Sequence, residues 1–216
     1  MQQTASRRIS KQEMKQSITY LTLTVLSLAS CNDHSHSVTK KNNMAATTGN
    51  SPAFHGGYRE VNGIKMYYEI YGQGKPVVLV HGGGSTIQTN FGKIIPLLAK
   101  NRKVIAVELQ AHGRTGDRNS DLSFEQDADD VVTLLKNLHI GRADFFGFSN
   151  GGTTTLQIAI RYPEAVDKLI LGSALAKRNG VPAWFWDFMK QAKLENMPEQ
   201  LKAGYKQVAA DPAGLQ

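Results

Sequence analysis

After residue 57, the apolar and polar positions of the chain fall into two alternating kinds of segment. Short, continuous apolar runs are typical of strands buried in a parallel sheet, and they cover residues 76–80, 103–109, 143–149 and 166–174. Between them lie segments with apolar residues at helical spacing, at residues 91–100, 123–140 and 151–163. This alternation predicts an α/β fold, with a mostly parallel, doubly wound sheet and helices on both faces.

Two local signals add detail to this order. Residues 58–72 contain two strand-like runs around Asn62-Gly63, a strong signal for a hairpin turn. Ser123 precedes a helical segment and Gln126 follows three residues later, as in a capping box. We therefore expect a hairpin ahead of the parallel strands and a helix that begins after Ser123.

Length and composition fit one domain with a large core, because the chain has 216 residues and an ordinary apolar content. The formal net charge is +7, but part of it lies in the first 30 residues and the remaining basic residues are scattered. Charge therefore gives no reason to expect nucleic-acid binding. The single Cys excludes an internal disulfide bond.

The first 30 residues differ from the rest and predict a signal peptide. A basic segment is followed by an apolar stretch from Ile18 to Ser30, which has the length of a signal-peptide core and is short for a membrane span. The stretch ends in "LASC", which resembles the lipobox of bacterial lipoproteins. The resemblance implies lipidation at Cys31 and a lipid anchor that holds the exported protein to a bacterial membrane in the cell envelope. The alternative is an N-terminal tail that is merely apolar.

Residues 31–57 are rich in Ser, Thr, Asn and Gly and predict a flexible tether. His34 and His36 could bind a metal ion, but no further ligands stand near them in the sequence. We expect a solvated linker here and no metal site or organic cofactor in the chain.

One Ser lies among glycines where a predicted strand meets a predicted helix. Residues Gly147-Phe148-Ser149-Asn150-Gly151 have the spacing G-x-S-x-G, and this context is the one that a nucleophile elbow requires. The bend is tight, so the residues two places either side of the Ser must lack bulk. The sequence predicts Ser149 as a catalytic nucleophile, and the competing interpretation is a glycine-rich turn without chemistry.

A second motif, His81-Gly82-Gly83-Gly84, directly follows the strand at 76–80. Acyl transfer needs two N–H donors for the oxyanion: one from the residue after the nucleophile, and one from the loop after this earlier strand. We therefore predict an oxyanion hole made by Asn150 and Gly83. His81 precedes the Ser and is expected to brace the loop rather than to act as a base.

Together these motifs resemble the α/β-hydrolase family, in its single-domain branch of esterases, lactonases, prolyl aminopeptidases and perhydrolase-like proteins. The likeness begins near Tyr58 and implies a core at 58–176 and the start of a helical lid at 177–216. It implies a serine hydrolase that acts on an ester, lactone or amide bond of a small-molecule substrate through an acyl-enzyme. Glu108 and Ala111 depart from the Asp and Gly usual in the family.

The family's triad runs Ser, then Asp or Glu, then His, but all six His of this chain precede Ser149. We therefore expect a C-terminally truncated hydrolase that lacks the last strands of its sheet and is inactive as this chain. The alternative is a non-catalytic lipoprotein that binds a small apolar ligand or a partner. Perhydrolase or cofactor-free haloperoxidase chemistry is a third possibility for the same elbow. Substrate identity and oligomeric state are not predicted.

The aromatic stretch at 181–194 has two interpretations. It could form the roof of an apolar substrate pocket, or it could pack simply on the core.

Overall fold

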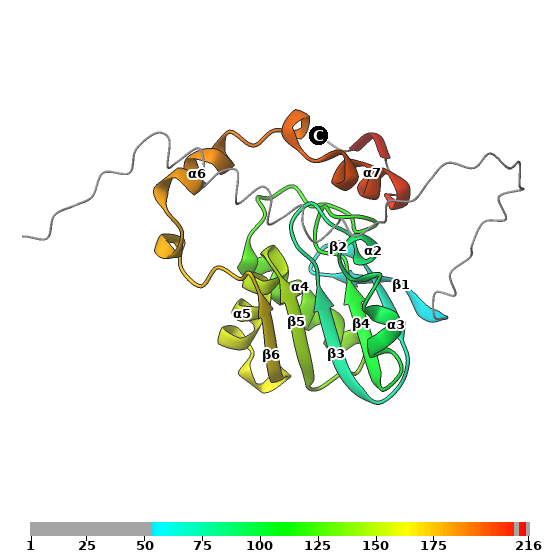
Figure 1. Cartoon of the computed structure of the whole chain (residues 1–216). Helices are drawn as coiled ribbons and strands as arrows, with labels where there is room; N and C mark the ends of the chain where they lie inside the picture. Colours follow the sequence, from blue (N-terminus) through cyan, green and yellow to red (C-terminus); the bar gives the residue numbers. More distant parts are fainter. Residues whose placement is uncertain (1–52, 210–211, 215–216) are drawn as a thin grey trace, which may run out of the picture. The chain divides into compact units, whose positions relative to one another are not determined.

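The fold is built on one six-stranded sheet, seen in the computed structural model, which describes residues 53–209 and 212–214 (Figure 1). The strands are β1 (Phe54–Val61), β2 (Ile64–Tyr71), β3 (Lys75–Val80), β4 (Arg102–Val107), β5 (Ala143–Phe148) and β6 (Val166–Gly172). Their order in the sheet is β1-β2-β4-β3-β5-β6. Strands β3, β4, β5 and β6 pair in parallel, whereas β2 is antiparallel to both β1 and β4. The predicted α/β fold with a mostly parallel sheet is confirmed.

The helices that alternate with the parallel strands cover both faces of the sheet. They are α2 (Ile87–Phe91), α3 (Ile95–Leu98), α4 (Phe124–Asn137) and α5 (Asn150–Arg161). Helices α6 (Ala183–Lys190) and α7 (Glu199–Val208) follow β6 along the chain. Short 3₁₀ turns occupy Pro163–Ala165, Arg178–Gly180, Leu194–Asn196 and Pro212–Gly214. Apolar residues of α4 and α5 form one core with one face of the sheet, and those of α2 and α3 form a second core with the other face.

The predicted hairpin around Asn62-Gly63 is present as β1 and β2. Both turn residues adopt positive φ, 44° at Asn62 and 89° at Gly63, as a tight hairpin turn demands. Strand β1 begins at Phe54, so the last four residues of the predicted tether, 54–57, lie in a strand. Of the other tether residues, the structure describes Ala53 alone. The predicted signal peptide and Cys31 lie outside the described residues.

The single helix expected at 91–100 is wrong, because two short helices occupy this region. Helix α2 ends at Phe91, and α3 begins at Ile95 with Pro96 in its first turn. Proline lacks an N–H and is tolerated in a first helical turn but not in a helix interior. Pro96 therefore starts a new helix instead of continuing the previous one.

Helix α4 begins where the sequence predicts, after Ser123. The Ser123 hydroxyl accepts a hydrogen bond from Gln126 N at 3.1 Å. The reciprocal half of the predicted capping box is absent from α4, because the Gln126 side chain donates to Asp130 at 2.9 Å instead.

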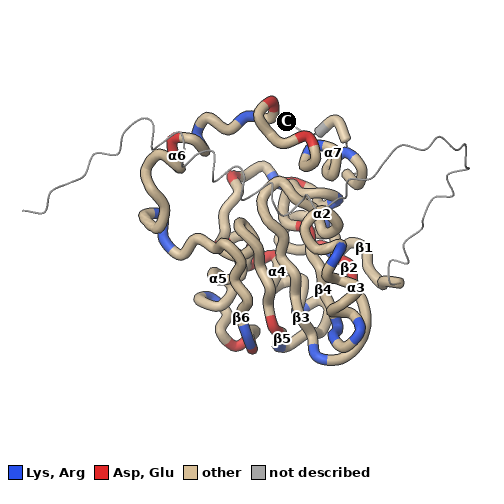
Figure 2. Tube along the Cα trace, in the orientation of Figure 1, with Lys and Arg blue, Asp and Glu red and all other residues tan. Residues whose placement is uncertain are grey.

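Charged side chains are spread over the described elements rather than gathered on one of them (Figure 2). Among residues 53–209 and 212–214, every helix is too short or too polar to span a bilayer.

Candidate active site

The bend between β5 and α5 lifts one hydroxyl-bearing residue into solvent. Ser149 has φ 52° and ψ −115°, and the residue is exposed. Its N–H donates to Gly172 O at 2.7 Å, so neighbouring strand β6 helps to hold the bend. A non-glycine residue at such a backbone angle stores strain, and strain of this kind clusters at functional sites.

Two glycines make the bend possible, as its sequence spacing predicts. A Cβ atom on Gly147 would lie 2.2 Å from Gly151 O. A Cβ atom on Gly151 would lie 2.1 Å from Val80 O. Both distances are far below van der Waals contact, so any side chain at either position would force β3, β5 and α5 apart.

The glycine loop after β3 lies beside this bend. A Cβ atom on Gly82 would lie 3.4 Å from Ser149 Cβ, and one on Gly83 would lie 3.7 Å from Asn150 Cβ. The structure therefore brings together the three residues that the sequence selects as nucleophile and oxyanion donors.

The backbone N–H groups of this loop are not equally available. Gly82 N donates to Asn90 Oδ1 at 2.7 Å, and Gly84 N donates to His112 Nε2 at 3.0 Å. Within the described part of the chain, neither Gly83 N nor Asn150 N donates a hydrogen bond. The two unpaired donors are those that an incoming anionic oxygen would need.

Two histidines brace the loop and cannot act as bases in this arrangement. His81 is fully buried; its Nδ1–H donates to Gly82 O at 2.8 Å, and its Nε2 accepts from Leu109 N at 3.1 Å. Burial, followed by the nearby His112, lowers the pKa of His81 to about 3. His112 is engaged in the same way, with Nδ1 at 2.8 Å from Gln110 O. The bracing role expected of His81 is confirmed.

Glu108, which stands where the family usually has Asp, is buried and structural. Its carboxylate accepts from Arg114 N at 2.6 Å and from the Arg114 guanidinium at 2.8 Å. Burial raises the pKa of Glu108, and the hydrogen bond and charge of Arg114 oppose this rise. The pairing fixes the loop that carries His112.

Sequence reasoning missed a second buried carboxylate, Glu69 of β2. Its oxygens accept from the hydroxyls of Tyr67 and Tyr71 and from Gln88 Nε2 at 2.9 and 3.0 Å. The alternation of strand β2 puts Tyr67, Glu69 and Tyr71 on one face. No motif in the sequence distinguishes this carboxylate from a solvated one.

A third buried carboxylate lies closer to the bend. Asp127 lies in the first turn of α4 and is only 5% exposed. Burial, followed by the negative charge of Asp130, raises the pKa of Asp127 to about 7, while Arg118 and Asn150 oppose the rise.

The segment after β6 packs partly on the glycine loop. A Cβ atom on Gly84 would lie 3.5 Å from Met197 Cε and 3.6 Å from Leu201 Cδ1, and α7 also lies against Thr89 at Gly204. Helix α7 therefore covers the outer side of the loop that precedes α2.

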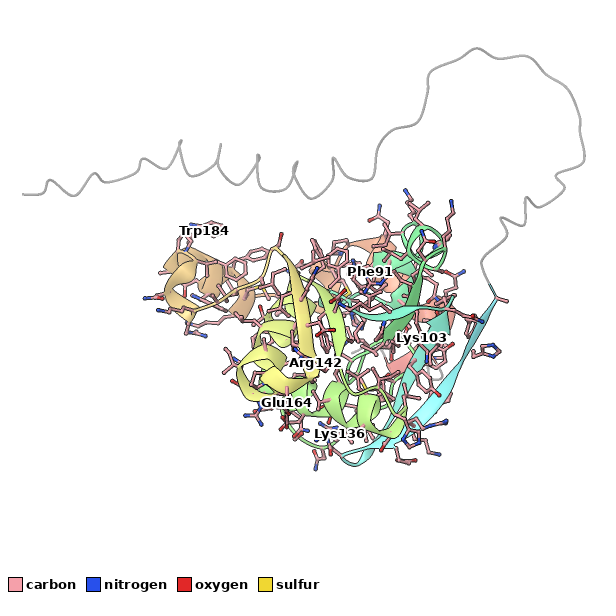
Figure 3. The ribbon with its side chains drawn as sticks, turned by 90° about the horizontal axis from the view of Figure 1, so that it is seen from below. Phe91, Lys103, Lys136, Arg142, Glu164 and Trp184 are labelled. Atoms are coloured by element: carbon pink, nitrogen blue, oxygen red, sulfur yellow. The ribbon has the colours of Figure 1, made fainter. Side chains whose placement is uncertain are left out.

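Helix α6 makes mostly local contacts. Trp184 stands at the outside of α6, 41% exposed (Figure 3). The Trp186 indole donates to Arg178 O at 2.8 Å, and the Arg178 guanidinium lies 4.2 Å from the Trp186 ring. A surface hollow of about 460 Å³ lies here, lined by Arg178, Asn179, Val181, Ala183 and Trp186.

No cluster of metal-ligating side chains occurs among the described residues.

The chain is similar to several hydrolases. It is 38% identical over 117 residues to 2-hydroxymuconate semialdehyde hydrolase of Pseudomonas sp. (strain CF600), covering 52% of this chain and 41% of that protein. It is 35% identical over 124 residues to the human serine hydrolase BPHL, covering 54% of this chain and 42% of that protein. The chain thus spans less than half the length of these curated relatives.

Solved structures of hydrolases are also similar to this chain. A variant of the meta-cleavage product hydrolase CumD matches with a TM-score of 0.59 and 28% identity, covering 74% of this chain and 59% of that one. The family model described as "alpha/beta hydrolase fold" matches residues 75–207, which include the glycine loop, the bend and all of α7 except its last residue. This chain therefore belongs to the α/β-hydrolase fold family.

Proposed function

We propose that this chain carries the nucleophile and the oxyanion hole of a serine hydrolase that acts on an ester, lactone or amide. The observation that carries the proposal is the exposed, strained Ser149 beside two unpaired N–H groups, those of Gly83 and Asn150. Preorganised donors of this kind stabilise the charge that develops in acyl transfer.

In the proposed reaction, Ser149 Oγ forms a bond to the carbonyl carbon, and the carbonyl π electrons move to the oxygen. The Gly83 and Asn150 N–H groups then hold that oxygen. Collapse of the tetrahedral intermediate expels the alcohol or amine, and water later cleaves the acyl-enzyme. The Ser149 proton passes to a base on attack, and the leaving group takes a proton as it departs.

That base is the weak part of the chemistry in this chain. All six His precede Ser149 in sequence, and both ring nitrogens of His81 and His112 are engaged. Loss of a nucleophile or base from a triad costs on the order of a millionfold in kcat. We propose that this chain by itself turns substrate over slowly or not at all.

The engagement of both ring nitrogens of His81 and His112 favours a second candidate function. In it, the protein keeps the fold, lacks catalysis and binds a small apolar ligand or a partner. The two candidates differ in whether Ser149 reacts. One relative is named for the hydrolysis of 2-hydroxymuconate semialdehyde, whereas the name of the human relative gives no substrate. We therefore propose no particular substrate for this chain.

Reaction of Ser149 with an aryl fluorophosphonate tests the hydrolase proposal. Intact mass should show one adduct on the unaltered chain, faster with added imidazole as an external base, and none on Ser149→Ala. Ser173→Ala is the matched control, because Ser173 is also exposed and has a positive φ of 54°. Equal labelling of the Ser149→Ala variant would refute the nucleophile and leave the binding function as the better candidate.

We further propose, from the "LASC" sequence alone, that Cys31 is lipidated and anchors the protein in the cell envelope. Metabolic labelling with an alkyne fatty acid in a bacterial host should tag the unaltered chain and not Cys31→Ser. A tag retained by Cys31→Ser would contradict the anchor.

A further inference from the structure

Helix α6 has an apolar side that faces solvent. None of the eight residues of this helix is buried, and Trp184, Phe188 and Met189 are exposed. Trp184 and Phe188 are four residues apart and therefore share one side of the helix. The two charged residues of α6, Asp187 and Lys190, pair with each other at 3.4 Å, and the helical period puts them on the opposite side. The helix is thus amphipathic with its apolar side uncovered.

The other two aromatic residues of α6 are held by local contacts. The rings of Phe185 and Trp186 lie 5.2 Å apart, and the Trp186 indole donates to Arg178 O at 2.8 Å. Both residues are half-buried. The support of the helix therefore comes from these residues, and its exposed side chains are available to a partner.

Four cationic side chains flank the apolar side. Lys177 and Arg178 precede the helix, Lys190 is its last residue and Lys193 follows it; all four are exposed. Asp187 is the only acidic residue among residues 177–193. Lys177, Arg178 and Lys193 make no ion pair with another residue of the described chain. The surface around α6 is therefore both apolar and positively charged.

The hollow at the start of α6 holds one of these cations beside an apolar wall. Arg178 and Asn179 line the hollow together with Val181, Ala183 and Trp186. The Arg178 guanidinium lies 4.2 Å from the Trp186 ring, and its N–H groups donate no hydrogen bond within the described part of the chain. Guanidinium N–H groups bind phosphate oxygens in pairs, so the hollow suits a phosphate group that carries an apolar body.

We propose that α6 and its four flanking cations dock on the surface of an anionic lipid bilayer. Trp184 and Phe188 enter the boundary between head groups and acyl chains, where amphipathic helices and Trp side chains are favoured. The cations bind the lipid phosphates. A second copy of this chain is a poorer occupant, because it would bring two sets of like charges together. The inference needs neither the reaction of Ser149 nor a lipid at Cys31.

Tryptophan fluorescence of the full chain tests this docking, because both tryptophans, Trp184 and Trp186, lie in α6. The signal therefore reports on α6 and not on the apolar stretch at 18–30. Vesicles of phosphatidylcholine that contain phosphatidylglycerol should shift the emission to shorter wavelength, and lipids with brominated acyl chains should quench it. Vesicles of phosphatidylcholine alone should need on the order of a hundredfold more lipid for the same shift, because they offer the cations no net charge.

Two variants with matched controls separate the apolar and the charged contributions. Phe188→Ser should need on the order of tenfold more anionic lipid for the same shift, because it loses an aromatic side chain that lipid would bury. Phe188 is 64% exposed; Ile160→Ser is its control, because Ile160 is 65% exposed but lies on α5. Lys193→Gln should need about fivefold more lipid. Lys100→Gln, which also removes an exposed cation without an ion pair, should change nothing.

An emission spectrum that anionic vesicles leave unchanged would overturn the proposal, and this result needs no variant to fold. Equal shifts with neutral and anionic vesicles would also overturn it, because the cations would then have no role. So would equal lipid requirements of Phe188→Ser and Ile160→Ser. A shift that appears without vesicles and grows with protein concentration would overturn it in favour of a second copy.

Discussion

Replacement of Asp127 by Asn should make the protein more stable at neutral and alkaline pH. Burial, followed by the charge of Asp130, raises the pKa of this carboxyl group from 3.8 to about 7 in the folded chain. A group whose folded pKa is raised binds its proton more tightly in the native state. Its contribution to stability is therefore complete below about pH 4 and is lost as pH rises toward 7.

The size of the effect follows from the shift. One pKa unit corresponds to about 1.4 kcal/mol, so a shift of about three units costs about 4 kcal/mol once Asp127 is fully ionised. Asn cannot ionise and escapes this loss. The unfolding free energy of Asp127→Asn minus that of the unaltered chain should therefore rise by about 4 kcal/mol between pH 4 and pH 8.

Urea unfolding at several pH values, followed by circular dichroism, measures this difference. Asp129→Asn in the same helix is the control, because Asp129 pairs with Arg161 at 2.8 Å near the surface. Its difference from the unaltered chain should lack this steep rise. A difference for Asp127→Asn that is independent of pH would refute the reasoning, because it would mean that Asp127 titrates alike in the folded and unfolded chains.

Two further changes test the fold around the site. Gly151→Ala should destabilise the protein by about 3 kcal/mol or more, because the new Cβ would lie 2.1 Å from a backbone oxygen of β3. Gly116→Ala is the control and should cost little, because its Cβ would have no atom within 4 Å. Equal unfolding midpoints in urea for the two variants would show that the bend tolerates a methyl group. Ile170→Lys should reduce self-association in sedimentation, because Ile170 is 56% exposed on β6 at the edge of the sheet. Exposed apolar edge strands tend to pair with other chains. Unchanged sedimentation would indicate that this edge does not associate.

Local sequence signals predicted the parts of the fold whose causes are local. The apolar runs of β3, β4 and β5 are buried on both faces and need no partner to be recognised, and the G-x-S-x-G spacing carries its own steric reason. The prediction of one helix at 91–100 was wrong for a local reason as well, since Pro96 lies in the first turn of a new helix.

The polar interior could not be predicted, because its contacts join distant segments. Glu69 meets Gln88 and lies 3.7 Å from Arg114 only after the sheet and its loops have assembled. Nothing in the alternating pattern of β2 distinguishes this carboxylate from a solvated one. The same holds for Asp127, because the burial that raises its pKa arises only when the chain has folded.

Asp127 shows how misleading the local view can be. An acid in the first turn of a helix is ordinarily stabilised in its charged form by the helix dipole, by about 0.3–1 kcal/mol. Read along the sequence, Asp127 is such a residue, and its pKa should fall. In the folded chain, Asp127 is only 5% exposed, and burial raises its pKa to about 7 instead. The corresponding cost of about 4 kcal/mol is several times larger than the dipole contribution, so burial determines the charge of this group.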